Sequence, residues 1–382
     1  MSEWKKVKLG EICERVTSGG TPKANVSSYY NPPTIPWLKT KEVNYCRITE
    51  TENYISEEGL KNSSAKLISP NSVINAMYGQ GDTAGRIAIN KIPLATNQAC
   101  CNLTIDKSKA DYEFIYYQLC TLYDKLVSLK AGAAQPNLNA RIIKNLEIIM
   151  PSLPIQHRIA SILSRYDSLI ENYQKQIKLL GEAAQRLYKE WFIDLHFPGH
   201  ENTNIIDGVP EGWEKKKVGD ITPIITGKKD ANFGTPDGEY PFFTCSQEPI
   251  KAPSFSFDCA AVLLAGNGDF NVKLYRGRFE AYQRTYVLSP YIDSHLYLLF
   301  YTISANMTKL AAGSSGSTIK FLTKGMIDGI NLNVPNDEIL RSFNKKVEPI
   351  QSSRESLQSQ LRLLTEARDR LLPKLMSGEI TI

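Results

Sequence analysis

The sequence has few of the residues from which metal centres and catalytic sites are usually built. Its 382 residues include only 4 histidines and 7 cysteines, and the cysteines form no C-x-x-C pair and no zinc-finger spacing. We therefore expect buried, reduced thiols, which are typical of the cytosol. No G-x-x-x-x-G-K-[ST] motif is present, which excludes the standard ATP-driven motor. The sequence predicts neither a metal site nor a cofactor bound by this chain.

Long apolar runs and concentrated charge are also missing. The runs at 260–265 and 296–300 are too short to span a bilayer, and the start, MSEWKK, lacks the apolar core of a signal peptide. We expect a soluble, cytoplasmic protein. The net charge of +5 is not gathered into a polybasic arm, so the composition permits DNA binding without requiring it. With 42% hydrophobic residues, the chain can bury the cores of at least two domains.

Three local patterns resemble catalytic or binding motifs but are incomplete. The Asn31–Thr34 segment (NPPT) has Thr where an amino-methyltransferase loop needs an aromatic residue to stack on a flipped base. The Gly266–Phe270 segment (GNGDF) lacks the third glycine of a nucleotide loop, so a hairpin turn is expected there. His196 and His200 are separated by Pro198 and Gly199, which removes the helical spacing of a zinc pair. No catalytic set remains.

What the chain does contain is an internal repeat. The segment Trp4–Ile12 reappears as Trp213–Ile221, and Ile142–Pro151 recurs as Met326–Pro335. Each copy is a globular stretch followed by a long helix. We predict four parts: a first globular domain at 1–150, a central helix at 151–200, a second globular domain at 201–335 and a C-terminal helix at 336–382.

Both predicted helices have apolar residues spaced alternately four and three positions apart, as in a coiled coil. The second seam is interrupted by Arg354 and Arg368. An approximate two-fold relation between the copies would pair the helices antiparallel; the plainer alternative is an ordinary amphipathic core helix. The seam residues we single out are Ile159, Leu163, Tyr166, Ile170, Tyr173, Ile177, Leu180, Leu187, Leu357, Leu361, Leu364 and Leu371.

The two globular parts combine short β-rich runs with helices such as the one expected at 111–129. Both have a small-residue loop after their main helix, at 131–135 and 312–317. Segments 31–67 and 233–257 have no obvious counterpart in each other, so a shared frame carries different inserts. We expect an α+β fold: two mixed α/β domains joined by two long helices in an antiparallel coiled coil, with pseudo-two-fold internal repetition.

Five segments, several of them at the starts and ends of the two predicted helices, are specific enough to compare with a known family: Arg186–Glu201 (RLYKEWFIDLHFPGHE), Glu366–Ile380 (EARDRLLPKLMSGEI), Leu146–Gln156, Ser18–Pro22 and Ile35–Trp37. They closely resemble segments of the specificity subunits of type I restriction-modification enzymes. That family usually has Glu-Gln where the long helices begin, whereas this chain has Ile155-Gln156 and Asp337-Glu338.

The resemblance implies a non-catalytic subunit in which 1–150 and 201–335 are target recognition domains that each read half of a bipartite double-stranded DNA target. It implies that the coiled coil sets the spacing of the two halves and docks two methyltransferase subunits, and that restriction/translocase subunits complete the enzyme. S-adenosylmethionine would then belong to the methyltransferase, and ATP with magnesium to the translocating nuclease.

Reading DNA requires polar side chains in the major groove and Lys or Arg on phosphates. Our candidate DNA-binding residues are Lys39, Lys41, Gln80, Arg86, Gln135 and Asn137 in the first domain, and Lys228, Lys229, Asn267, Arg276, Arg278, Arg284 and Lys320 in the second. Two rival interpretations remain: a coiled-coil scaffold whose globular ends bind proteins, and a free-standing methyltransferase or nuclease.

Overall fold

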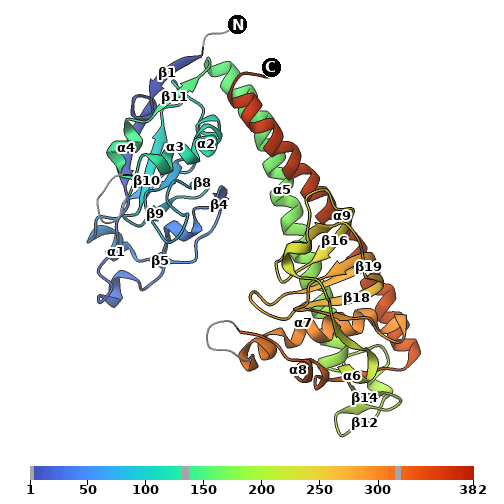
Figure 1. Ribbon diagram of the computed structural model, residues 1–382. Helices are drawn as coiled ribbons and strands as arrows, with labels where there is room; N and C mark the ends of the chain where they lie inside the picture. The colour runs from blue at the N-terminus through green and yellow to red at the C-terminus, as the bar shows by residue number, and fades with distance from the viewer. Residues whose placement is uncertain (1–3, 131–136, 315–319) are drawn as a thin grey trace. The chain divides into compact units, whose positions relative to one another are not determined.

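The computed structural model describes residues 4–130, 137–314 and 320–382, which form two compact units (Figure 1). The first unit comprises Met1–Asn172 and Gln360–Ile382, and the second comprises Tyr173–Ser359. Each unit therefore contains one mixed domain together with a part of both long helices. Because the division runs through the helices, it does not test the domain boundaries that the sequence suggests.

The domain of the first unit has a five-stranded sheet, a four-stranded sheet and a two-stranded ribbon. The five-stranded sheet is ordered β2 (Cys13–Ser18), β10 (Cys100–Ile105), β7 (Val73–Ala76), β8 (Ile87–Asn90) and β4 (Cys46–Ile48). The four-stranded sheet is ordered β5 (Tyr54–Ile55), β3 (Ile35–Leu38), β9 (Leu94–Thr96) and β6 (Leu67–Ile68), and the ribbon pairs β1 (Lys5–Lys8) with β11 (Glu147–Met150). The helices are α1 (Glu57–Lys61), α2 (Tyr112–Thr121), α3 (Tyr123–Ser128) and α4 (Ala140–Lys144), with 3-10 turns η1 (Leu9–Ile12), η2 (Ser27–Tyr29) and η3 (Thr40–Glu42).

The domain of the second unit is built on a six-stranded sheet and two ribbons. The sheet is ordered β15 (Ile224–Thr226), β20 (Thr285–Leu288), β18 (Phe257–Ala265), β19 (Val272–Ala281), β16 (Tyr240–Phe243) and β17 (Ile250–Ala252). The ribbons pair β14 (Glu214–Lys217) with β21 (Asn331–Val334) and β12 (Ile205–Ile206) with β13 (Val209–Pro210). The helices are α6 (Val218–Ile221), α7 (Leu296–Gly313) and α8 (Lys324–Asp328), with 3-10 turns η5 (His200–Asn202), η6 (Ala231–Phe233) and η7 (Asp293–His295).

The two domains share one strand order, which confirms the internal repeat. The strand order β2-β10-β7-β8-β4 in the first domain corresponds to β15-β20-β18-β19-β16 in the second domain. The likeness extends to direction, because β4 pairs parallel with β8 and β16 pairs parallel with β19, whereas the other pairs are antiparallel. In both domains a ribbon strand, β11 or β21, leads directly into a long helix.

The two domains differ in the segments that have no counterpart in each other's sequence, 31–67 and 233–257. In the first, the segment after β2 supplies β3, β5 and β6 of the four-stranded sheet. In the second, the corresponding region adds only β17 to the edge of the main sheet. The helix expected at 111–129 is wrong in one respect: it breaks at Leu122 into α2 and α3.

The long helices are α5 (Leu153–Tyr188), which ends in the π-helical turn η4 (Lys189–Ile193), and α9 (Asp337–Met376). Pro154 lies in the first turn of α5, where the missing N–H costs nothing. Pro349 does not interrupt the second helix, because α9 begins at Asp337 and runs on through this residue.

Within each unit the two helices run antiparallel, as the sequence predicts. In the first unit Ile159 and Leu163 of α5 share a core with Leu371 and Leu375 of α9. In the second unit Ala184 and Tyr188, near the end of α5, share a core with Phe343 and Val347, near the start of α9. Of the seam residues named from the sequence, Ile159, Leu163 and Ile170 are buried and the other nine are half-buried.

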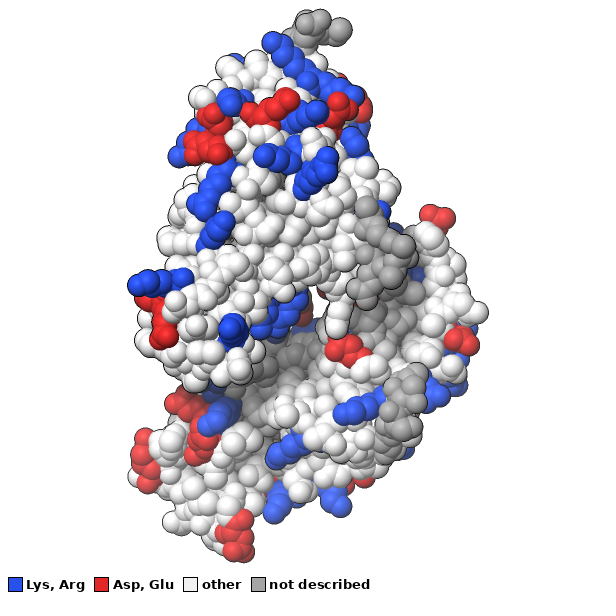
Figure 2. Space-filling view, turned by 90° about the vertical axis from the view of Figure 1, so that its left-hand side faces the viewer, with Lys and Arg blue, Asp and Glu red and all other residues white. Residues whose placement is uncertain are grey.

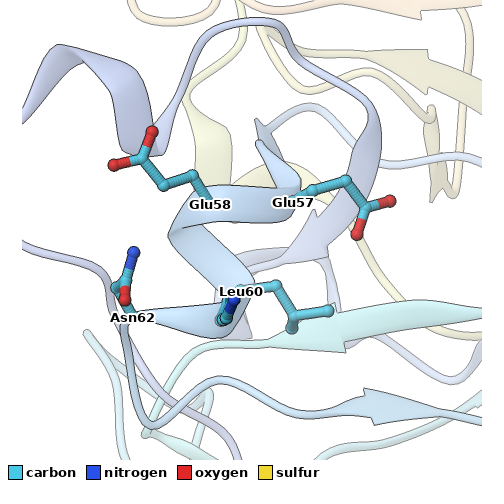
Figure 3. A pocket seen from close by; sticks show the side chains of 5 residues that line it. Glu57, Glu58, Leu60 and Asn62 are labelled. Atoms are coloured by element: carbon cyan, nitrogen blue, oxygen red, sulfur yellow. The ribbon is translucent and has the colours of Figure 1, made fainter.

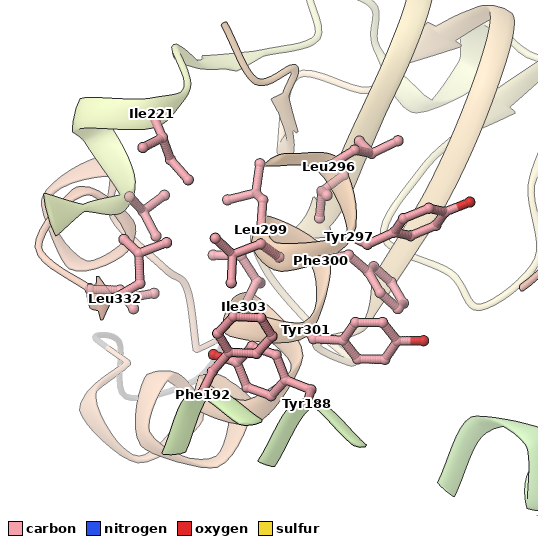
Figure 4. Packing of buried hydrophobic residues seen from close by; sticks show 14 of the residues in the cluster. Tyr188, Phe192, Ile221, Leu296, Tyr297, Leu299, Phe300, Tyr301, Ile303 and Leu332 are labelled. Carbon is pink, nitrogen blue, oxygen red and sulfur yellow. The ribbon is translucent and has the colours of Figure 1, made fainter. Parts of the chain in front are cut away.

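Aromatic packing fixes α7 on the helices of the second unit (Figure 4). The Tyr188 ring stacks on Tyr301 with centroids 5.9 Å apart, and its hydroxyl lies 3.0 Å from the Thr302 hydroxyl. Phe192 meets Phe343 edge-on at 4.8 Å. The second domain is therefore attached to α5 and α9 mainly by apolar burial.

The first domain is attached to its helices by charge as well. Asp167 of α5 accepts hydrogen bonds from Arg47 (2.9 Å), from the Tyr117 hydroxyl (2.5 Å) and from Arg368 of α9 (2.9 Å). Arg47 also contacts Glu113 of α2 at 2.6 Å. Desolvation acts to lower the pKa of the Arg47 guanidinium, but neighbouring Tyr117 and Glu113 hold it above its usual value. The domain and both helices thus share one buried ionic network.

The seven cysteines are all free thiols; Cys100 and Cys101 are buried, whereas the other five are half-buried, so the expectation of burial holds only for those two. In the described ranges, no helix is long and apolar enough to cross a membrane.

Candidate nucleic-acid interface

In the second domain, four chain segments meet at one corner of the sheet and enclose a polar groove. β15 ends there, β18 ends there, β20 begins there, and residues 321–322 cross beside them. Leu322 donates its N–H to Gly266, and Gly266 donates to the Arg284 carbonyl, both at 2.8 Å. The groove has a volume of about 300 Å³ and is lined by Thr226, Gly266, Gln283, Arg284, Tyr286 and Leu322.

Five of the seven candidates in this domain lie at this corner. Arg284 lines the groove, and Asn267 forms a β-bridge with Phe321, next to Lys320. Lys229 forms a bridge with Tyr282, which places Lys228 and Lys229 beside Gln283. The GNGD segment lies in the loop 266–271 that joins the antiparallel strands β18 and β19, so the expected hairpin is present, and Gly268 has a φ of +68° within it. The Lys229 ammonium lies over the Phe233 ring, 4.3 Å from its centroid, which leaves Arg284 in the groove and the exposed Lys228 and Lys320 on the adjoining chain. These three cations suit a phosphate-bearing ligand.

The remaining two candidates of the second domain are engaged elsewhere along β19. Arg276 donates to the Tyr297 hydroxyl at 2.8 Å and lies 3.6 Å from Glu348 of α9. Arg278 pairs with Asp258 at 3.1 Å and lies over the Phe255 ring. Arg276 therefore holds the sheet against the helices, and neither residue belongs to the groove.

The first domain has the same corner in the same register. β2 ends at Ser18, β10 begins at Cys100, and Met77 donates its N–H to the Ala99 carbonyl at 2.8 Å. Leu138 then donates to the Met77 carbonyl at 3.0 Å, as Leu322 does to Gly266 in the second domain.

Of the first-domain candidates, Asn137 precedes Leu138 at this corner, and Gln80 is exposed on the loop after β7. Arg86 follows on the same loop, where it pairs with Asp82 at 2.6 Å, an interaction that raises the pKa of Arg86. Gln135 lies outside the described residues, as do the rest of the 131–135 loop and residues 315–317.

Lys39 and Lys41 lie beyond β3 and have partners within the domain. Lys39 donates to Asn53 at 2.9 Å and lies over the Trp37 ring, 5.1 Å from its centroid. Lys41 pairs with Glu52 on the surface, which raises the pKa of Lys41. An exposed ion pair of this kind is weak, so a phosphate could compete for Lys41.

Sequence reasoning missed the exposed glutamine that each corner carries, Gln98 and Gln283. Their equivalence follows from strand register: Cys101 pairs with Ser18, and Tyr286 pairs with Thr226. The flanking residues differ between the two domains, so a comparison of letters alone does not align these positions. Matching the two predicted strands to each other would have been needed to find them.

Charge on the visible surface does not form one continuous basic stripe (Figure 2). Lys and Arg gather at the upper end of that face with Asp and Glu among them, above a broad uncharged stretch. A second pocket, of about 410 Å³, lies on α1 and is lined by Glu57, Glu58, Leu60, Lys61 and Asn62 (Figure 3). Its two carboxylates disfavour a phosphate ligand.

No cluster of His, Cys, Asp and Glu suited to a metal ion occurs among residues 4–130, 137–314 and 320–382. The His196 and His200 rings lie 5.3 Å apart, and Nδ1 of His200 is 2.9 Å from the Phe197 carbonyl.

Comparison with known proteins places these features in context. Residues 1–180 and 210–353 match the family model of the type I restriction modification DNA specificity domain. The type I restriction enzyme MjaIX specificity subunit of Methanocaldococcus jannaschii is 27% identical over 100% of this chain and 94% of its own length. The EcoDI specificity subunit of Escherichia coli is 36% identical over 45% of this chain and 40% of its own length. The crystal structure of the type I restriction-modification S subunit from M. genitalium has the same fold, with a TM-score of 0.69 at 17% identity, covering 98% of this chain and 96% of that one.

Proposed function

This chain belongs to the type I restriction modification DNA specificity family, and from that premise we propose how its two domains act on DNA. It is the specificity subunit of a type I restriction-modification system. We propose that each domain reads one half of a bipartite target through the corner of its sheet. The observation that carries this proposal is the repeated corner, which has one frame and different side chains in the two domains.

The chain's own role in the complex is then recognition and geometry. The helices α5 and α9 connect the two domains and would set the spacing of the half-sites. We propose that the same helices dock two methyltransferase subunits, and that restriction/translocase subunits join them. S-adenosylmethionine would bind to the methyltransferase, and ATP with magnesium to the translocase, so this chain would take part in methylation and cleavage without catalysing either.

The cationic side chains at the corner of the second domain differ in whether they suit a base or a phosphate. A guanidinium such as that of Arg284 can donate two hydrogen bonds to guanine, whereas the exposed Lys228 and Lys320 are suited to phosphates. Arg284→Ala should weaken binding by about 1–3 kcal/mol at one base position, and a lysine change should weaken all sequences alike.

The test is DNA binding by the chain reconstituted with its methyltransferase, measured on a randomised duplex library. We expect selection of one target with two defined parts and a fixed gap. If the complex binds all sequences equally, or if Arg284→Ala weakens every sequence uniformly, the corresponding assignment is wrong.

A further inference from the structure

Gln98 and Gln283 occupy one and the same position in the two repeats. Gly19 donates to the Cys100 carbonyl at 3.2 Å, and Gly227 donates to Thr285 at 3.1 Å. In each domain the glutamine lies two residues before that acceptor, at the point where β10 or β20 begins.

The backbone beneath both glutamines is held rigidly. A Cβ on Gly19 would collide with the Thr96 and Asn97 carbonyl oxygens, and a Cβ on Gly227 would collide with that of Ala281. Two strands therefore touch just before each glutamine. Gln283 is fixed further by its own N–H, which donates to the Lys229 carbonyl at 2.9 Å. A side chain carried on such a frame is well placed for specific recognition.

The side chains at this position are alike although their neighbours are not. Gln98 is followed by Ala99 and preceded by Asn97, whereas Gln283 is followed by Arg284 and preceded by Tyr282. Both glutamine side chains are exposed, so burial in a core does not explain why both repeats have this residue. A residue that two differently specific domains share should read a feature that both half-sites share.

The amide group itself indicates which base this is. A glutamine amide can accept a hydrogen bond from N6 of adenine and donate one to N7, a pair that no other base offers in the major groove. In the first domain the Thr21 hydroxyl donates to Oε1 of Gln98. That oxygen has a second lone pair, so Thr21 can orient the amide while leaving both adenine contacts open.

We propose that Gln98 and Gln283 each read an adenine, one in each half of the target. The inference rests on the proposed function, because it requires that the two domains bind two half-sites. Gln283 lines the polar groove of its corner, where the exposed Lys228 and Lys320 would hold the adjoining phosphates.

The experiment uses the complex of the full chain with its methyltransferase and duplexes that carry the selected target. Each adenine, on either strand, is replaced in turn by 7-deazaadenine, which lacks the N7 acceptor. The wild-type complex should lose affinity at one adenine in each half. Gln98→Leu should abolish that sensitivity in one half only, and Gln283→Leu in the other half only. Base discrimination at the affected position should fall by about 5- to 150-fold, the value of one good bidentate pair.

The unaffected half-site in each variant shows that the protein remains folded. A control, Asn202→Leu at an exposed position of η5 outside α5, α9 and the groove, should leave base preference unchanged at every position. If both glutamine variants keep the wild-type response to 7-deazaadenine, or if one half-site contains no adenine on either strand, the inference is overturned while the proposed function stands. A wild-type complex without sequence preference overturns both.

Discussion

At the scale of single residues, Asp167 is the carboxylate on which the attachment of the first domain depends. Its side chain is 7% exposed and the Arg47 side chain 8%, so both charges have left water. Arg47 comes from β4, Tyr117 from α2 and Arg368 from α9. Removing one partner of a buried ion pair leaves the others uncompensated, which is more costly than losing a surface pair.

Asp167→Ala should therefore lower the free energy of unfolding of the protein by about 3–5 kcal/mol. The matched control is Glu366→Ala, which removes the exposed Arg370–Glu366 pair of α9 and should cost about 0.5 kcal/mol or less. Urea denaturation of both variants measures the difference. Equal, small effects would mean that apolar packing alone holds the domain on its helices.

The half-buried and buried thiols predict a dependence of stability on pH. Burial raises the pKa of Cys13, Cys101 and Cys120 from 9.0 to about 12. Because the folded protein favours the neutral thiols, their stabilising contribution is fully present below pH 9 and is lost between about pH 9 and 12. Urea unfolding at pH 8 and pH 10.5 should show lower stability at the higher pH. The loss should be smaller in Cys101→Ala, and an equal loss in that variant would contradict a role for this thiol.

At the scale of elements, the two arginines in the seam of the second helix are explained by their partners. Arg368 pairs with Asp167 on the facing helix. Arg354 lies opposite Gly181 of α5 and donates to Gln351 at 3.0 Å. The two-fold relation between the repeats predicted the antiparallel pairing of the helices, and the heptad pattern predicted the helices themselves. It did not predict Asp167 or Gly181 as partners, because each lies outside the apolar positions that define the pattern.

Gly181 provides a test of this packing. A Cβ at this position would lie 3.4 Å from the Arg354 guanidinium, which is ordinary contact, and alanine favours the helix over glycine. Gly181→Ala should stabilise the protein by about 0.5–1 kcal/mol, whereas Gly181→Val should displace Arg354 and remove the gain. Thermal unfolding of the two variants measures this. Destabilisation by alanine would show that Arg354 needs the space that glycine leaves.

At the scale of the whole molecule, the repeat was the most reliable guide that the sequence offered. It predicted two related mixed domains, each followed by a long helix, and the shared strand order confirms this. The recognition corner was only partly predictable. Lysines and arginines can be chosen by charge, but Arg276 and Arg278 turn toward Tyr297 and Asp258, because strand direction and tertiary pairing decide which charges remain available.

A map of adenine methylation across the source genome, with this gene present and with it deleted, tests whether this chain selects the methylated sites. We expect one bipartite methylated motif to disappear on deletion and to return when the gene is restored. Restoration with Gln98→Leu should relax one half of that motif only. A methylation map that deletion leaves unchanged would contradict the assignment of this chain as the subunit that selects the sites.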